Sequence, residues 1–319
     1  MNQISFVVDK LALHYYQAEL LLFSLENFAH HPKQAILVQC VHGVDAEFLN
    51  FLSQNSYNYR IIEPFLDGKY CNKIQQLEAF NNLAEGNVML LDTDMFVLEP
   101  LNVPEVDLFC GKIVDASNPP LHVIQNIFNE ANLKINKIVD TDWKLENSQT
   151  IDSNFNGGFY YIPNKHLKLI STTWKKWATW LFNRIDLFEN HNQAIHVDQI
   201  AMAMTLCEKN ISYKSINSNY NCPIHSSIKL NSFNKNIPIS LLHYHREITP
   251  FGILNLQYSA NKYIENIWLQ RNIIPYCLKG VTQNITRGTP NQRLGMVVKI
   301  LRSCFLKTLI IKIASATRN

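Results

Sequence analysis

The stretch Asn87-Val-Met-Leu-Leu-Asp-Thr-Asp-Met-Phe-Val-Leu-Glu-Pro100 decides how the rest of the chain is organised. Val88 to Leu91 form a continuous apolar run, which is typical of a strand buried on both faces of a parallel sheet. The run ends at Asp92-Thr93-Asp94, and apolar residues resume at Met95. This pattern puts two carboxylates at the carboxyl end of a buried strand, which is where open α/β sheets bind their ligands.

The carboxylates of Asp92 and Asp94 are costly in such a position, because like charges repel each other and burial disfavours ionisation. A divalent cation removes this cost. Mg²⁺ and Mn²⁺ prefer hard oxygen ligands, and Mg²⁺ commonly uses one or two carboxylates together with substrate phosphates. The sequence therefore predicts a metal site at Asp92 and Asp94, and the alternative is a turn that Asp92 caps.

The composition limits the kind of protein. The 319 residues are 47% hydrophobic and 17% charged, which is enough to bury the core of one large domain or two. The net charge of +3 is too small to indicate nucleic-acid binding. The seven cysteines are scattered without a C-x-x-C pair, which argues against a disulfide framework or structural zinc site and fits a reducing cytosol. Because no signal peptide or membrane-length apolar run is recognisable, we expect a cytoplasmic protein.

Strands alternate with helices in the first hundred residues. We expect strands at 4–8, 35–41, 59–63 and 88–91, and helices at 18–28, from 45 onward, and at 72–83. Such alternation predicts βαβ units and an α/β fold with a mostly parallel sheet flanked by helices. No G-x-G-x-x-G turn follows the first strand, so the sheet is not a dinucleotide-binding sheet of the usual kind.

Further motifs follow in the second half of the chain. Asp140-Thr-Asp142 is a second D-x-D, but no apolar strand precedes it, so we expect surface turn chemistry. Gly157-Gly158 interrupt an aromatic strand, which indicates a bulge or a close backbone approach to a ligand; the alternative is a simple hairpin kink. The alternation in Ser240–His245 puts His243 and His245 on one face of a strand. A same-face histidine pair beside a carboxylate site is a candidate set of metal ligands.

The chain carries four motifs in a familiar order: Leu91-Asp-Thr-Asp94, Asn154-Phe-Asn-Gly-Gly-Phe159, Val197-Asp-Gln199 and Leu242-His-Tyr-His245. Together they resemble the GT-A fold glycosyltransferases, especially the retaining galactosyltransferase and glycogenin-like branch of bacterial surface-sugar enzymes. The resemblance implies a Rossmann-like GT-A domain at 1–255 and leaves a helical C-terminal extension at 256–319. It also implies a nucleotide-sugar donor, usually a UDP-sugar, a Mn²⁺ or Mg²⁺ cofactor, and a glycan or lipid-linked acceptor such as lipopolysaccharide.

The resemblance implies roles for individual residues. Asp92, Asp94 and His243 would hold the metal, with His245 as the alternative histidine. Asp198 and Gln199 would face the anomeric carbon of the donor sugar and transfer it with retention; the alternative for Asp198 is a helix cap. The implied donor-binding residues are Val8, Asp9, Tyr15, Tyr16, Lys73, Asp92, Thr93, Asn156, Gly157, Gly158 and Arg246.

The position of Asp9 at the end of the first strand predicts that the segment from Asp9 to Tyr16 contacts the base and ribose of the nucleotide. Tyr15 or Tyr16 would stack on the base. The alternative is that these tyrosines begin the first helix.

The chain departs from the family pattern in two places. The family's histidine is commonly followed by Gly and then Lys-Pro-Trp, whose lysine contacts the diphosphate, whereas Arg246 and Pro250-Phe-Gly252 follow here. Arg246 and Lys73 are the candidates to replace that lysine. Ile200 stands where some members carry an aspartate after the D-Q pair. The expectation of retention therefore rests on Asp198 and Gln199 alone.

Two other functions are consistent with paired carboxylates on such a sheet. Nucleotidyltransferases usually carry a glycine-rich phosphate loop after the first strand, but Val8-Asp-Lys-Leu-Ala-Leu-His14 contains no glycine. A nucleotide-sugar-binding protein without transferase activity would not need Asp92 and Asp94.

The C-terminal stretch 295–313 alternates apolar residues with Lys299, Arg302, Lys307 and Lys312. On a helix, this pattern fits either a surface that lies in the membrane interface on anionic lipid or a helix that packs on the catalytic domain.

Overall fold

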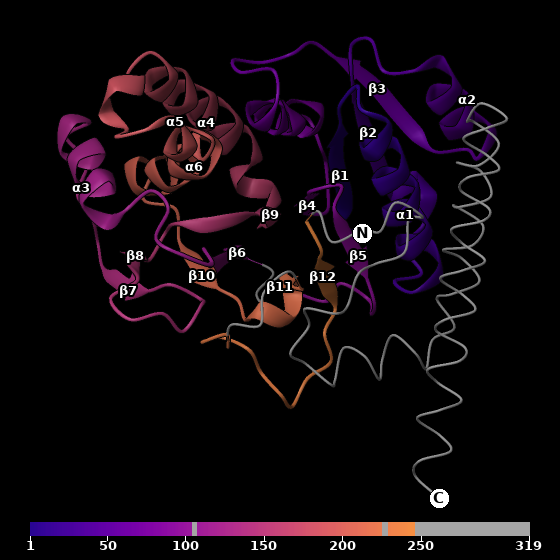
Figure 1. Ribbon diagram of the computed structural model, residues 1–319. Helices are drawn as coiled ribbons and strands as arrows, with labels where there is room; N and C mark the ends of the chain where they lie inside the picture. Colours follow the sequence, from indigo (N-terminus) through magenta and orange to yellow (C-terminus); the bar gives the residue numbers. More distant parts are fainter. Residues whose placement is uncertain (104–106, 225–228, 246–319) are drawn as a thin grey trace, which may run out of the picture. The chain divides into compact units, whose positions relative to one another are not determined.

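A seven-stranded, mostly parallel sheet forms the centre of the fold in the computed structural model, which describes residues 1–103, 107–224 and 229–245 (Figure 1). In spatial order, its strands are β10 (Tyr213–Ser215), β6 (Phe109–Ile113), β9 (Phe155–Ile162), β4 (Val88–Leu91), β1 (Gln3–Val8), β2 (Ile36–Val41) and β3 (Asn58–Ile62). β9 is antiparallel to both of its neighbours, and the other pairs are parallel.

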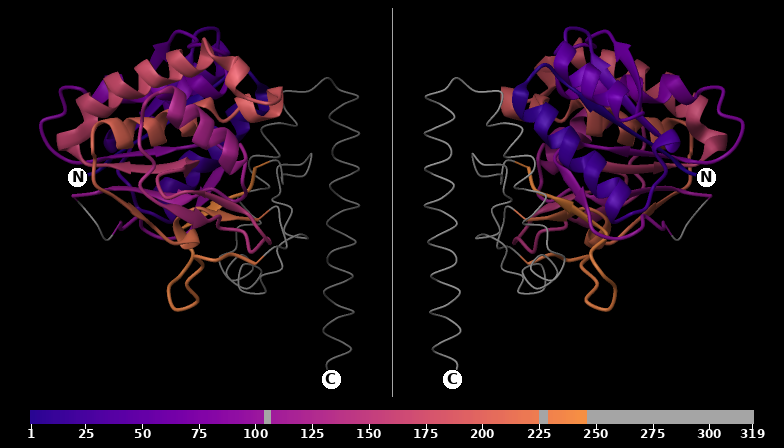
Figure 2. Two further views of the ribbon diagram at one scale, coloured as in Figure 1. Left: turned by 90° about the vertical axis from the view of Figure 1, so that its left-hand side faces the viewer. Right: turned by 90° about the vertical axis from the view of Figure 1, so that its right-hand side faces the viewer.

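Helices cover both faces of this sheet. Figure 1 shows α1 and α2 beside β1 to β3, and Figure 2 shows the pink helix α4 above the central strands. The helical segments are α1 (Ala12–Asn27), α2 (Ala46–Gln54), α3 (Leu121–Glu130), α4 (Leu167–Phe182), α5 (His191–Ala194) and α6 (Val197–Glu208), with the 3₁₀ segments η1 (Lys33–Ala35), η2 (Tyr70–Phe80), η3 (Asn164–His166), η4 (Ile185–Leu187) and η5 (Ser218–Tyr220). The α/β fold class predicted from the sequence is therefore confirmed.

β4 lies between two hydrophobic cores, which explains its unbroken apolar sequence. Every residue of β4 is buried. Val88 and Leu90 belong to the core with η2, α3, α4 and α6, whereas Met89 and Leu91 belong to the core with α1 and α2. Successive side chains of a strand point to opposite faces, so a strand covered on both faces needs apolar residues at every position.

A smaller three-stranded sheet brings distant parts of the chain to the end of β4. It consists of β11 (Cys222–Pro223), β12 (Leu241–His243) and β5 (Met95–Val97), in that order. β12 pairs antiparallel with β5, with His243 opposite Met95. The end of the 241–243 strand therefore lies beside the turn that holds Asp92 and Asp94. A separate hairpin pairs β7 (Ile138–Asp140) with β8 (Gln149–Ile151).

The helix boundaries differ from the prediction in three places. α1 begins at Ala12 rather than at 18, so Tyr15 and Tyr16 lie inside it. The segment expected to be a helix at 72–83 is the 3₁₀ segment η2, whose start is fixed by the Asp67 carboxylate accepting from the backbone N–H groups of Lys69 and Cys71. The sequence also predicts one continuous helix at 165–188, but these residues form η3, α4 and η4 instead.

Some sequence predictions concern residues outside the described ranges. They are the role of Arg246, the domain boundary at 255, the helical extension 256–319 and its contact with membrane. Among the described residues, no helix is both long and apolar enough to cross a membrane.

The prediction that Asp140-Thr-Asp142 is surface turn chemistry is wrong for Asp142, although Asp140 is exposed. Asp142 is 2% exposed and lies 3.3 Å from the Nζ of Lys112, which is fully buried. Its carboxylate also accepts hydrogen bonds from the hydroxyls of Ser218 and Ser232. Burial alone would raise the pKa of Asp142, but Lys112 and these hydrogen bonds outweigh it and lower the pKa.

We predict that Asp142→Asn destabilises the fold by about 3 kcal/mol at neutral pH, because it removes a charge partner of buried Lys112. Because the pKa of Asp142 is lowered in the folded protein, its contribution to stability is fully present above pH 3.8. This contribution is lost as the pH falls through the folded-state pKa of Asp142. Urea unfolding at neutral and acid pH measures both effects. The control Asp140→Asn changes an exposed carboxylate and should stay within about 0.5 kcal/mol of wild type. Equal stabilities for the two variants would contradict the prediction.

Candidate active site

The turn between β4 and β5 is held from both sides by backbone hydrogen bonds. The N–H of Asp92 donates to the carbonyl of Gly158 in β9 at 3.0 Å, and the N–H of Tyr244 donates to the carbonyl of Asp94 at 3.0 Å. These bonds fix the turn between β9 and the residues that follow β12. Side chains from η2, this turn, β9, α6 and the end of β12 therefore meet at the carboxyl end of β4.

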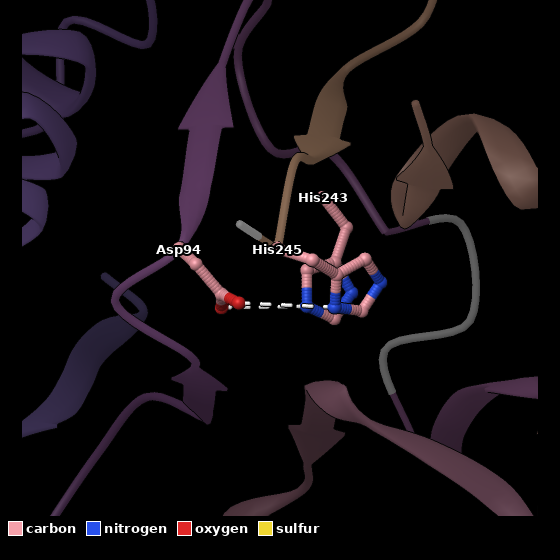
Figure 3. Close-up of side chains that lie close together, drawn as sticks. All are labelled: Asp94, His243 and His245. Carbon is pink, nitrogen blue, oxygen red and sulfur yellow. Dashed lines mark ion pairs between the residues drawn. The ribbon is translucent and has the colours of Figure 1, made fainter. Parts of the chain in front are cut away.

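Asp94, His243 and His245 form one half of the site (Figure 3). Nε2 of His243 lies 3.3 Å from Oδ1 of Asp94, and Nδ1 of His245 lies 3.8 Å from Oδ2. The two imidazole rings are stacked, with centroids 3.7 Å apart. His245 has a left-handed backbone (φ 50°), which is uncommon outside glycine and accompanies the packing of its ring against His243. The prediction that both histidines lie on one face of a strand is wrong for His245, because β12 ends at His243 and the left-handed turn at His245 brings its ring against His243.

One ligand atom from each of these three residues lies within 4.8 Å of the others, a spacing that a single metal ion can bridge. The donor set also fits such an ion, since carboxylates suit Mn²⁺ and imidazoles suit transition metals in general. Burial raises the pKa of Asp94, although His245 and Lys73 act in the opposite direction. A bound cation would favour the ionised carboxylate.

Lys73, Asp92 and Asp198 form the other half of the site. Nζ of Lys73 lies 2.6 Å from Oδ1 of Asp92 and 3.5 Å from Oδ2 of Asp198, and it donates to the carbonyl of Gly157 at 3.3 Å. Burial disfavours the ammonium, but Asp92 and Asp198 outweigh this effect and raise the pKa of Lys73. Lys73 thus joins the first carboxylate of the D-x-D motif to the start of α6.

Asp198 is 2% exposed and lies in the first turn of α6, after the N-cap position, which His196 occupies. It is therefore not the helix cap. Burial raises the pKa of Asp198 to about 6; Lys73 opposes this rise and Asp92 adds to it. Oδ1 of Asp198 is buried and has no hydrogen-bond partner among the described residues. Lys73 thus holds the carboxylate through Oδ2, while Oδ1 is enclosed by the fold.

Gln199 is oriented by a residue that sequence reasoning missed. Nε2 of Gln199 lies 3.2 Å from Nδ1 of His196, and Nε2 of His196 lies 3.0 Å from the side-chain amide of Asn118. Burial, with a smaller effect from Lys73, lowers the pKa of His196 to about 4, so the imidazole is neutral at pH 7 and carries one N–H. It can therefore accept from only one of the two amides, either Gln199 at Nδ1 or Asn118 at Nε2. The position of His196, two residues before Asp198, was the sequence feature that could have indicated this role.

Gly157 and Gly158 allow β9 to pass directly beneath the site. A Cβ on Gly158 would lie 2.7 Å from both Cε1 of His243 and Cε of Met95. One on Gly157 would lie 3.1 Å from Oδ2 of Asp198 and Nζ of Lys73. β9 is one strand through both residues, so the hairpin-kink alternative is not observed, but its pairing with β6 shifts register between Phe155 and Tyr160, which is the predicted bulge. The β9 backbone therefore lies close to other groups at both glycines, as expected, and these groups are side chains of the site.

The residues predicted to hold the nucleotide lie around α1 and the end of β1. Asp9 accepts a hydrogen bond from Nδ2 of Asn72 at 2.8 Å, and burial raises its pKa. The ring of Tyr15 is stacked on Phe48 with centroids 5.1 Å apart, and its hydroxyl accepts from the N–H of Asp45. Tyr15 therefore packs inside the core as part of α1.

Three further members of the predicted donor-binding set are already bonded or buried within the fold. Val8 and Tyr16 are buried. The carbonyl of Thr93 accepts from the hydroxyl of Tyr244 at 3.4 Å.

Comparison with known proteins identifies the family of the chain. Residues 4–209 match the family described as the Rhodobacterales glycosyltransferase domain. The match spans more than half of the 319-residue chain, and the protein belongs to this glycosyltransferase family. The resemblance to glycosyltransferases predicted from the four motifs is thus confirmed. No curated protein sequence matches the chain.

Several solved structures are similar to the chain at low sequence identity. The galactosyltransferase LgtC, in complex with donor and acceptor sugar analogs, is 16% identical with a TM-score of 0.49, covering 84% of this chain and 96% of that chain. Mouse xyloside xylosyltransferase 1 is 11% identical with a TM-score of 0.44, covering 77% and 98%. The glycosyltransferase GlyE of Streptococcus pneumoniae TIGR4 is 16% identical with a TM-score of 0.44, covering 85% and 64%.

We predict that Gly158→Ala displaces His243 from Asp94 and costs about 1–3 kcal/mol of stability, because the added methyl group overpacks a filled space. Urea unfolding and a crystal structure of the variant measure the two effects. Gly111→Ala is the matched control, since its Cβ would lie 2.7 Å from Cγ of Phe155 without a contact to either histidine. It should lose stability while the distance between His243 and Asp94 stays unchanged. A Gly158→Ala protein with wild-type stability and geometry would contradict the prediction.

Proposed function

We propose that the protein is a metal-dependent glycosyltransferase that takes its sugar from a nucleotide diphosphate sugar, with a UDP-sugar as the expected donor. The observation that carries the proposal is the meeting of Asp94, His243 and His245 within 4.8 Å, beside a lysine that joins Asp92 to Asp198. One half of the site is suited to a cation and its phosphates, and the other half to a sugar. The sequence resemblance supports Mn²⁺ or Mg²⁺, and the imidazoles favour Mn²⁺.

The metal would be held by Asp94 and His243, with His245 next to them. Asp92 contributes to the same end of β4, but Lys73 holds one of its oxygens at 2.6 Å. A cation bound here would supply positive charge to the departing nucleoside diphosphate. Lys73 adds a fixed positive charge on the side of Asp92 and Asp198, where negative charge on the leaving group is stabilised as well.

The remaining groups bind and orient the donor sugar. Asp198, buried in the first turn of α6, is the proposed contact for the sugar. Gln199, held by His196, faces the same region from the next position of α6. The absence of side chains at Gly157 and Gly158 lets Lys73, Asp198 and His243 pack directly on the β9 backbone. Asp9 at the end of β1 remains the proposed contact for the nucleoside.

We further propose that the acceptor is a glycan or lipid-linked glycan and that the sugar is transferred with retention of configuration. Both proposals derive from the motif resemblance, and retention is tied to Asp198 and Gln199. The NMR coupling constant of the anomeric proton in the product decides between retention and inversion. An inverted product would overturn the assignment of the D-Q pair.

We predict that Asp94→Asn lowers metal-dependent turnover of a UDP-sugar at least about 100-fold and weakens Mn²⁺ binding in parallel, because one anionic ligand is lost. Isothermal titration with MnCl₂ and release of UDP measure the two effects. Asp186→Asn is the control, because the Asp186 side chain is 70% exposed and lies in η4. An Asp94→Asn enzyme with wild-type metal affinity and turnover would show that the site is elsewhere.

A further inference from the structure

A chain of polar contacts connects the second D-x-D motif to His243. The Lys112 ammonium lies between the carboxylates of Asp115 and Asp142. The side chain of Asn156 donates from Nδ2 to Oδ2 of Asp115 at 3.0 Å, and Asn221 donates from Nδ2 to Oδ1 of Asn156 at 3.1 Å. Oδ1 of Asn221 then lies 2.9 Å from Nδ1 of His243.

The direction of every hydrogen bond in this chain is fixed at its Asp115 end. A carboxylate only accepts hydrogen bonds, so Asn156 must turn its NH₂ group toward Asp115. Its Oδ1 is thereby turned toward Asn221 and also accepts from the N–H of Gly158 at 2.9 Å. Asn221 must then present its NH₂ group to Asn156 and its Oδ1 to His243. An oxygen in that position accepts only from a protonated Nδ1.

These hydrogen-bond directions are incompatible with a hydrogen bond from a neutral His243 to Asp94. With the proton on Nδ1, the lone pair of Nε2 faces Oδ1 of Asp94 at 3.3 Å, and two acceptors in contact require a cation or a proton between them. The opposite tautomer would satisfy Asp94 but would put Nδ1 against the oxygen of Asn221. The contacts therefore prepare Nε2 as a metal ligand.

We propose that Asn221 is a positioning residue that holds the proton of His243 on Nδ1 and thereby presents Nε2 to the metal. Asp115, which is paired with buried Lys112, anchors Asn156, and Asn156 holds Asn221 in turn. The inference rests on the proposed function for the metal, but the position of the proton is a property of the protein itself. Partners of this kind, which orient a metal-binding histidine through its second nitrogen, typically change metal affinity 10- to 100-fold.

The first measurement is the imidazole ¹⁵N chemical shifts of His243 in the metal-free protein, at a pH well above the ordinary range of imidazole. His243→Gln assigns the signal. We expect protonated Nδ1 in wild type and a mixture of tautomers in Asn221→Ala. Asn221→Asp keeps an acceptor for Nδ1–H but loses the donor to Oδ1 of Asn156, so it should shift the tautomer back toward protonated Nδ1 relative to Asn221→Ala. A loss of packing alone would not produce this rescue.

The second measurement is Mn²⁺ affinity of the same proteins by isothermal titration. We expect binding to weaken about 10- to 100-fold in Asn221→Ala and to return toward the wild-type value in Asn221→Asp. Asn219→Ala is the matched control: Asn219 is as buried as Asn221, but its amide donates to the carbonyls of Asn234, Ile237 and Pro238. Its loss should leave both the tautomer and the Mn²⁺ affinity unchanged.

Protonated Nε2 in wild-type His243, or an Asn221→Ala protein with the wild-type tautomer and affinity, would overturn the inference. A wild-type protein that does not bind Mn²⁺ would instead overturn the proposed metal dependence. In that case the tautomers of wild type, Asn221→Ala and Asn221→Asp still support or overturn the positioning role of Asn221, so the two failures are distinguishable.

Discussion

The carboxylates that meet at the carboxyl end of β4, Asp198 buried and Asp92 and Asp94 partly exposed, are the constraint on which the site depends. Asp92, Asp94 and Asp198 converge there, and carboxylates this close to one another and to the core cannot all be ionised without compensation. Lys73 compensates Asp92 and Asp198 directly, at 2.6 and 3.5 Å. Asp94 faces His243 and His245 instead, on the side of the site that we propose for the metal. The ammonium of Lys73 therefore lies on one side of the site, and the position that we propose for the metal ion lies on the other.

The fold supplies this arrangement through elements that are far apart in the sequence. β4 ends between two cores and cannot shift its register without exposing apolar side chains. β12 pairs with β5 directly after the turn, and this pairing brings His243 to Asp94. β9 passes under both halves of the site at two residues without side chains. Lys112, Asp115 and Asp142 stabilise the opposite side of the site, from which Asn156 and Asn221 reach His243.

The sequence predicts the parts of this arrangement that depend on local pattern. The apolar run before Asp92 predicts β4 without knowledge of the tertiary structure. The period of two from His243 to His245 predicts a strand that in fact ends at His243. The burial of Asp142 cannot be predicted from local pattern, because Lys112, the partner that stabilises it, lies 30 residues earlier in the sequence. The pairing of Asp92 with Lys73 is equally invisible, so the sequence treats Asp92 and Asp94 as equivalent although the structure separates them. Asn221 lies in an asparagine-rich segment, where its composition gives no sign of its contact with His243.

The central claim is that the imidazoles of this site bind the catalytic metal together with Asp94. Pulsed electron paramagnetic resonance of Mn²⁺ bound to the protein in the presence of UDP detects nitrogen atoms directly coordinated to the ion. The account predicts nitrogen coupling from histidine in the wild-type protein, its change when histidine is labelled with ¹⁵N, and loss of the His243 component in His243→Gln. A Mn²⁺ spectrum without histidine nitrogen coupling, or one unchanged in His243→Gln, would contradict the account.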